Sequence, residues 1–106
     1  MSTDYADRAG GIRAASETVL EEAQRIIHGD RPAAYGHPLD DFARTGRLWG
    51  AVLGIHDVPA ETVALMLAMV KVSRQVNLPK RDNLVDLVGY TGCIERIERE
   101  RARRKE

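Results

Sequence analysis

Apolar residues recur along this chain at intervals of three and four, the spacing that places them on one face of an α-helix. Four segments show this spacing, and they cover residues 17–28, 38–53, 62–76 and 82–98. No segment alternates between apolar and polar residues, as a half-buried strand would. The pattern therefore predicts an all-α protein in which four helices joined by short loops form a bundle-like domain.

The ends of these segments carry residues that are typical of helix boundaries. Ser16 is a candidate N-cap for the first helix, and Gly29 is placed to end it. Pro38 suits the first turn of the second helix, and Gly54 is placed to end that one. Between the two helices we expect residues 30–37 to form a loop.

The second and third segments differ in where their apolar residues fall. In the second, Phe42, Trp49 and Leu53 form one stripe, which we expect to face the core. The third is apolar on nearly every side, with Val63, Leu65, Met66, Leu67, Met69, Val70 and Val72. Such a helix is usually covered all round, so we predict that residues 62–76 are central and largely buried.

The length of 106 residues suggests one domain. We expect a flexible leader over residues 1–15, a helical domain over 16–98, and a charged helix end over 99–106. A domain of this size buries a modest core and is marginal alone, so we also expect a homo-oligomer, a homodimer being the simplest.

Composition limits the compartment and the partners. Lys plus Arg equals Asp plus Glu at 16 each, so nucleic acid is not an expected partner. The longest apolar run, residues 63–70, is far shorter than the ~20 residues of a membrane-spanning helix. Cys93 stands alone, and residues 1–8 lack the apolar core of a signal peptide. We therefore predict a cytoplasmic protein with no membrane association.

Two carboxylates at the start of the last helix are candidate metal ligands. Asp82 and Asp86 are four residues apart and share a helical face. Mg²⁺ takes carboxylate and water ligands, so such a pair suits it. Asp82 is equally explained as a helix cap. Asp86 follows Val85 in an apolar stretch, where a carboxylate is costly unless it is paired or ligated.

Polar residues at the end of the third helix lie near these carboxylates in the expected bundle. Lys71 and Arg74 are three residues apart on one face, and Asn77 follows them. They could bind phosphate. Alternatively, Lys71 could form a buried ion pair with Asp86 that only fixes the helix register. The sequence leaves both roles open.

The expected loop combines several chemically distinct side chains, as binding loops often do. Arg31 could hold phosphate, Tyr35 could stack on a base, and His37 could hydrogen-bond or titrate near neutral pH. Asp30 is a further candidate ligand contact. Each also has a structural alternative, in which Asp30 caps the loop, Tyr35 closes the bundle end and His37 holds a neighbouring aspartate.

The combined motifs resemble a short phage and prophage domain of unknown function, over about residues 16–98. That domain is in turn similar to the all-α, MazG-like NTP pyrophosphohydrolases. The residues that carry the resemblance are Gly29-Asp30-Arg31, Tyr35-Gly36-His37-Pro38, Phe42, Leu48-Trp49, Glu61, Ala64-Leu65-Met66, Lys71, Arg74, Asp82-Asn83, Asp86 and Gly89-Tyr90.

The resemblance implies an oligomeric, Mg²⁺-dependent enzyme that splits a nucleoside triphosphate into monophosphate and pyrophosphate, in the cytoplasm of the host if it is phage-encoded. Asp82 and Asp86 would hold the metal with Glu22, and Lys71 would complete the catalytic group. The spacing of the aspartates departs from the usual Glu-x-x-Asp. The first acidic motif is incomplete, because Arg25 stands where its third glutamate belongs.

Two other functions fit the same residues. One is a non-catalytic protein that binds a nucleotide or a nucleotide signal through the loop and the basic residues. The other is a helical phage protein that binds a host protein, in which the loop is a structural brace. The first would bind its phosphorylated ligand without a metal, unlike the enzyme. The second would bind no nucleotide.

Overall fold

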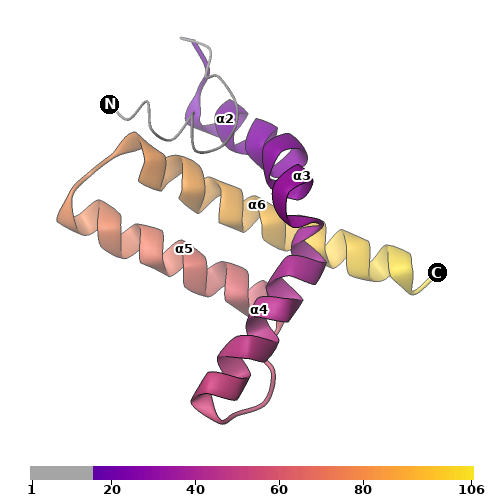
Figure 1. The fold of residues 1–106 in the computed structure, drawn as a ribbon. Helices are drawn as coiled ribbons and strands as arrows, with labels where there is room; N and C mark the ends of the chain where they lie inside the picture. Colours follow the sequence, from indigo (N-terminus) through magenta and orange to yellow (C-terminus); the bar gives the residue numbers. More distant parts are fainter. Residues whose placement is uncertain (1–15) are drawn as a thin grey trace.

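The computed structural model describes residues 16–106, and within this range the chain is helical and contains no strand (Figure 1). The all-α prediction is therefore confirmed. In chain order the elements are α2 (Val19–Arg25), the π-helical turn η1 (Ile26–Asp30), α3 (Arg31–Tyr35), α4 (Pro38–Leu53), α5 (Ala60–Asn77) and α6 (Arg81–Arg104). Because α2, η1 and α3 follow one another without a break, they act as the first of four helices.

The longest helix, α6, organises the others. It lies between α2 and α5 and forms an antiparallel pair with α5, while α4 crosses it towards its C-terminal end (Figure 1). The main core forms at that crossing, where Phe42 of α4 packs with Val63 and Ala64 of α5 and with Ile97 of α6. A smaller cluster, formed by Ala23, Ile26 and Val85, holds α2 on α6.

The first helix begins two residues later and ends seven residues later than predicted. Thr18, and not Ser16, is its N-cap, in a reciprocal capping box with Glu21. Gly29 does not stop the helix, so the predicted loop is wrong for residues 30–35. In η1 the Arg31 N–H bonds the carbonyl of Ile26, five residues back.

This widened turn directly precedes a proline, Pro32, which lacks an N–H and would crowd the carbonyls of an ideal α-helix. The chain turns only at Gly36, whose φ of +79° is in the region that glycine favours. The helix therefore continues through Gly29 and Pro32, which were expected to end it, because its turn widens locally.

Helix α4 starts at Pro38 and is followed by Gly54, as predicted, but it buries a different face. Pro38, Phe42, Gly46 and Gly50 are its buried positions, each four residues after the last. Gly46 has no side chain because the backbone of Val58 lies against it and donates a hydrogen bond to its carbonyl at 3.1 Å. Of the predicted apolar stripe, Phe42 is buried and Trp49 partly so, whereas Leu53 is 62% exposed.

Helix α5 is not buried all round, so that prediction is wrong. Val63, Ala64, Ala68 and Lys71 face α4 and α6. The opposite side is covered by nothing in the described part of the chain, and it exposes large apolar side chains: Leu65, Met66, Met69, Val70, Val72 and Val76. The molecule measures 42 × 35 × 19 Å along its principal axes, and so thin a body cannot surround a helix on every side.

A membrane-spanning helix must be both long and apolar. No helix within residues 16–106 combines enough length and enough hydropathy to cross a lipid bilayer.

Candidate functional site

Buried charged side chains lie on both sides of α6, where it packs on α5 and on α2. Lys71 of α5 and Asp86 of α6 form an ion pair with 2.7 Å between Nζ and Oδ2, and their side chains are only 10% and 14% exposed. Hence Lys71 pairs with Asp86, the structural alternative that the sequence left open. A buried pair is costly to desolvate, and a domain this small has little stability in reserve.

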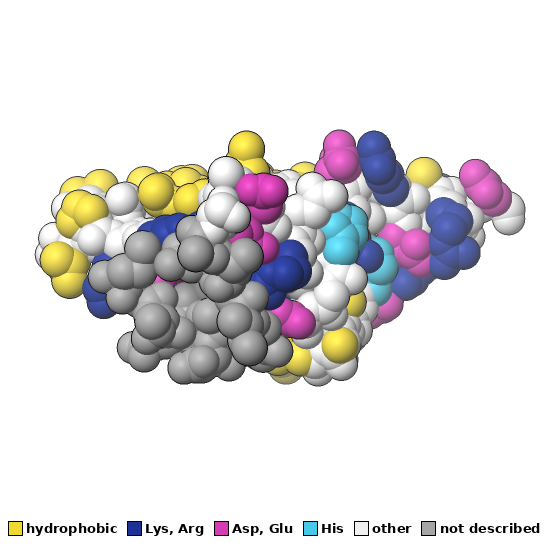
Figure 2. Space-filling view, turned by 90° about the horizontal axis from the view of Figure 1, so that it is seen from above, with side chains coloured by type: hydrophobic (Ala, Val, Ile, Leu, Met, Phe, Trp, Pro, Cys, Tyr) yellow, Lys and Arg dark blue, Asp and Glu magenta, His cyan; other side chains and the backbone are white. Residues whose placement is uncertain are grey.

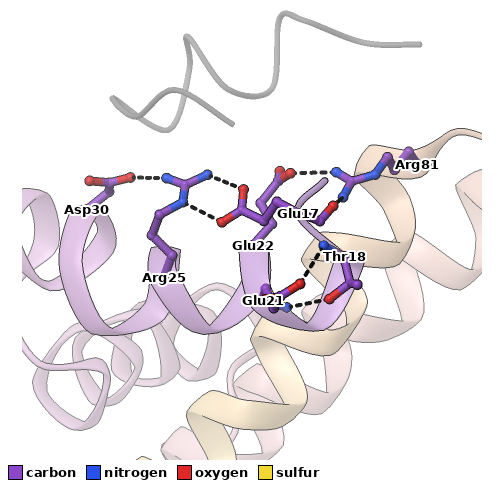
Figure 3. A network of polar contacts seen from close by, with 7 residues as sticks. All are labelled: Glu17, Thr18, Glu21, Glu22, Arg25, Asp30 and Arg81. Atoms are coloured by element: carbon purple, nitrogen blue, oxygen red, sulfur yellow. Dashed lines mark hydrogen bonds and ion pairs between the residues drawn. The ribbon is translucent and has the colours of Figure 1, made fainter. Parts of the chain in front are cut away.

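A second buried pair joins α2 to the start of α6. Glu22, whose side chain is 2% exposed, accepts a hydrogen bond of 2.5 Å from Nη1 of Arg81. Nη2 of the same arginine donates to the carbonyl of Glu17 at 2.9 Å. Figure 3 shows that Glu17 also binds Arg25, which reaches on to Asp30. Charged partners thus run along the whole length of α2.

Arg31 lies at the other end of this region, on three aromatic rings. Its guanidinium carbon is 5.4 Å from the ring centre of Tyr35, 4.9 Å from that of Phe42 and 5.4 Å from that of Tyr90. Nη2 donates to Asp41 at 3.4 Å. The Nε atom is buried, and it finds no hydrogen-bond partner among the described residues. A buried donor without a partner is costly and therefore calls for an explanation.

A small cavity of about 40 Å³ adjoins this arginine. Arg31, Asp86 and Tyr90 form its polar wall, and Ala23, Ile26, Ile27, Val85, Gly89 and Cys93 form the rest. Burial raises the pKa of the Tyr90 hydroxyl, although the positive charge of Arg31 opposes that rise. Burial likewise raises the pKa of the Cys93 thiol, which favours the unreactive protonated form.

Two of the three residues predicted to hold magnesium contact basic side chains. Within residues 16–106 no three His, Cys, Asp or Glu side chains lie close enough together to hold a metal ion. Glu22 and Asp86 instead contact the cations of Arg81 and Lys71. Asp82, one turn before Asp86, is half-buried in the first turn of α6. Magnesium binding by Asp82, Asp86 and Glu22 stays a prediction.

The other predicted ligand contacts lie in three different settings. His37 has a structural contact, because its Nδ1 accepts the N–H of Leu39 at 3.0 Å and caps α4. Partial burial, the largest cause, lowers its pKa. Tyr35 is 59% exposed beside Arg31. Arg74 and Asn77 are exposed near the end of α5 and do not line the cavity.

Two residues that contribute to the site were not singled out from the sequence as site residues. Tyr90 follows Asp86 by four residues on α6, so the helical face shared with that carboxylate was a usable signal. Arg81 pairs with Glu22, which is 59 residues earlier in the chain, and no local pattern indicates that contact.

Comparison with known proteins shows that the chain belongs to the family described as "Domain of unknown function (DUF6378)", whose model matches residues 18–98. It is 40% identical over 86 residues to the Gene 55 protein of Mycobacterium phage D29, a match that covers 80% of this chain and 56% of the phage protein. It is 33% identical over 82 residues to the Gene 55 protein of Mycobacterium phage L5, covering 76% and 53%.

The chain therefore spans about half the length of the curated relatives it matches. No solved structure matches it. The predicted relation to a phage domain of unknown function is confirmed by these relatives, and the resemblance to MazG-like enzymes stays a prediction.

Proposed function

We propose that this chain binds a nucleotide or another phosphorylated small molecule at the Arg31 cavity, and that binding requires no metal ion. The observation that carries the proposal is the buried Nε of Arg31, a cationic donor without a partner in the described chain at the wall of a cavity. A guanidinium offers planar, paired donors that match phosphate oxygens.

The surroundings of Arg31 favour this role. Tyr35, Phe42 and Tyr90 hold the guanidinium on their ring faces. A guanidinium fixed in this way has little side-chain freedom left to lose when it binds an anion. Such preorganisation favours affinity for a phosphate even at a small site.

The size of the cavity limits which part of the ligand enters. A water molecule requires about 10–15 Å³ of cavity volume, so a cavity of 40 Å³ has room for a chemical group about as large as three water molecules. That room suits a single phosphoryl group and excludes a base. The exposed ring of Tyr35 beside Arg31 offers the base a stacking surface outside the cavity, a contact typically worth about 1–3 kcal/mol.

Lys71 supplies a second positive charge behind Asp86. A phosphate that enters beside Asp86 would be repelled by the carboxylate unless Lys71 compensates for it. The pair therefore makes the cavity wall close to neutral, and Arg31 sets the preference for an anion.

Metal-dependent hydrolysis, which the MazG-like resemblance implies, has less geometric support. It would require Glu22 and Asp86 to leave Arg81 and Lys71 and to turn towards a common metal ion. The resemblance and the all-α fold support a nucleotide as the ligand, whereas the pairing of the carboxylates favours binding over catalysis.

A thermal-shift panel tests the proposal. The protein is heated with each NTP and dNTP and with inorganic phosphate, in EDTA and then in Mg²⁺, and pyrophosphate release is followed in parallel. Stabilisation by at least one phosphorylated compound in EDTA supports the proposal. No stabilisation by any of them, or pyrophosphate release that Mg²⁺ starts and Asp86→Asn abolishes, overturns metal-free binding as the function.

A further inference from the structure

The three polar residues that line the Arg31 cavity differ in the hydrogen bonds they can make. Arg31 directs a buried donor, Nε, which has no partner among the described residues. The hydroxyl of Tyr90 can also donate, and burial raises its pKa, so it stays protonated near neutral pH. The carboxylate of Asp86 accepts only, and a carboxylate accepts several bonds at once, so it can bind Lys71 and a ligand together. The wall thus offers two kinds of donor and one acceptor.

The terminal phosphate of a monoester is complementary to this wall. It has three oxygens besides the ester oxygen, one for each of the three polar residues. A phosphate monoester loses its last proton near pH 6, so the form that keeps one proton is available close to neutral pH. In that form two oxygens accept hydrogen bonds, and the third carries an O–H that donates to Asp86. The proton also removes the repulsion between Asp86 and the ligand oxygen beside it.

We infer that the cavity selects the terminal phosphate of a monoester that keeps one proton, and discriminates against phosphate diesters and sulfate esters. The inference rests on the proposed function, because it assigns a class of ligand to the same cavity. A diester leaves only two oxygens for the wall, and its second substituent needs more room than 40 Å³. A sulfate ester has no proton at this pH, so its third oxygen would meet the carboxylate of Asp86 as a second acceptor.

Gly89 gives independent support for a ligand of this size. It lies inside α6 and lines the cavity. A Cβ at Gly89 would meet only Cγ2 of Ile27 among the described residues, at 3.5 Å, which is an ordinary contact. By contrast, a Cβ at Gly46 or Gly50 would collide with backbone. Glycine inside a helix is less favourable than alanine. Room for a phosphoryl group accounts for a glycine at position 89, whereas packing does not.

The exposed arginines at the other end of α6 do not form a comparable site. Figure 2 shows acidic and basic side chains next to one another over the C-terminal part of α6. There Glu100 binds both Arg103 and Arg104. Arg104 also binds Asp40. Exposed charges that are already paired and hydrated gain little from a further partner. We therefore expect the selectivity to arise in the cavity.

The test compares three small anions on the full chain at pH 6 in EDTA: methyl phosphate, methyl sulfate and dimethyl phosphate. About half of the methyl phosphate then keeps one proton, with a single negative charge like that of the other two. The Nε–H signal of Arg31 is followed by NMR during each titration, since this method measures weak binding at that atom directly. We expect methyl phosphate to bind at least tenfold more tightly than either of the other anions.

Two variants test the roles of the wall residues. Asp86→Asn replaces the acceptor with an amide that also donates, so the preference for methyl phosphate over methyl sulfate should fall from at least tenfold to about one. Gly89→Ala adds a methyl group to the wall and should weaken the binding of methyl phosphate at least tenfold. Gly29→Ala is the matched control, because a Cβ there meets nothing within 4 Å and does not line the cavity.

Circular dichroism checks that each variant is folded. If Asp86→Asn does not fold, the three anions on the wild type and the two glycine variants decide. Equal binding of the three anions to the wild type overturns the inference and leaves the proposed function standing. The inference alone also fails if a nucleotide stabilises the protein but methyl phosphate leaves the Arg31 signal unchanged, or if Gly89→Ala binds methyl phosphate as tightly as Gly29→Ala. If no phosphorylated compound binds, the proposed function fails together with the inference.

Discussion

Lys71 and Asp86 face each other across the contact between α5 and α6, with 2.7 Å between Nζ and Oδ2. Both groups arise from otherwise apolar stretches of sequence, so each would be costly to bury without the other. The pair links the two longest helices, and its aspartate also lines the cavity beside Arg31. If the proposed ligand binds there, stability and ligand binding are coupled at this position.

Removal of the lysine alone should destabilise the fold. Lys71→Met deletes a cation that pairs with the largely buried carboxylate of Asp86, and breaking such a pair typically costs about 3–5 kcal/mol. The double variant Lys71→Met/Asp86→Leu should recover most of the loss, because two apolar side chains replace the two charges. Urea unfolding followed by circular dichroism measures both. A single variant as stable as the exposed control Lys80→Met would show that the pair is not buried in solution.

Gly46 should tolerate no side chain. A Cβ at this position would lie 1.8 Å from the carbonyl oxygen of Val58, so either the connection to α5 or α4 itself must move. We expect Gly46→Ala to cost at least the ~1–3 kcal/mol of ordinary overpacking, since the clash is with backbone. Thermal unfolding tests this. An unchanged midpoint would mean that the segment after α4 does not lie on Gly46.

Gly29 should behave in the opposite way. It lies inside the first helix, within η1, and a Cβ there meets nothing within 4 Å. Gly29→Ala should therefore stabilise the protein by about 0.5–1 kcal/mol, through the lower entropy of the unfolded chain. If the residue instead ended the helix in a left-handed conformation, the same change would be destabilising, so the sign of the shift in midpoint decides between the two.

His37 should make stability depend on pH. Its pKa is lowered in the folded protein, chiefly by burial, and its neutral Nδ1 accepts the N–H of Leu39. The folded state therefore binds the proton less readily than the unfolded state, whose pKa is about 6.5. The stabilisation is present above pH 6.5 and is lost as the pH falls below it towards the lowered pKa.

The measurement for this prediction is the free energy of unfolding at pH 7.5 and at pH 5.5. His37→Asn keeps an N-cap acceptor but does not titrate in this range, so its loss of stability on acidification should be smaller than that of the wild type. His28→Gln, a change at an exposed histidine, is the control. Equal pH dependence in wild type and His37→Asn would contradict a capping role for the neutral ring.

The sequence predicted those features that depend on periodicity and on helix ends. The α-helical class, the start of α4 at Pro38 and its end before Gly54 follow from local rules that the fold obeys. The sequence left two roles open for Lys71, phosphate binding and pairing with Asp86. Pairing was one of them because Lys71 and Asp86 both interrupt apolar stretches, and their helices were expected to be neighbours.

Features that depend on tertiary contacts escaped prediction. The helix continues past Gly29 because η1 widens its turn before Pro32. No residue type in the sequence indicates such a change of helical pitch. The site at Arg31 depends on Phe42 and Tyr90, which come from two other helices. The apolar residues on nearly every side of α5 predicted burial, but the pattern does not indicate that the described chain leaves one side of this helix uncovered.

The most direct test of the central claim is the affinity for the best-stabilising phosphorylated compound, measured by titration calorimetry in EDTA. Arg31→Gln removes the guanidinium and should weaken binding at least tenfold, or about 1.4 kcal/mol, while Arg31→Lys should recover only part of that loss. Arg99→Gln, which changes a 78% exposed arginine of α6, should leave the affinity unchanged. Equal affinity in the wild type and in a folded Arg31→Gln would contradict the claim that this arginine binds the phosphate.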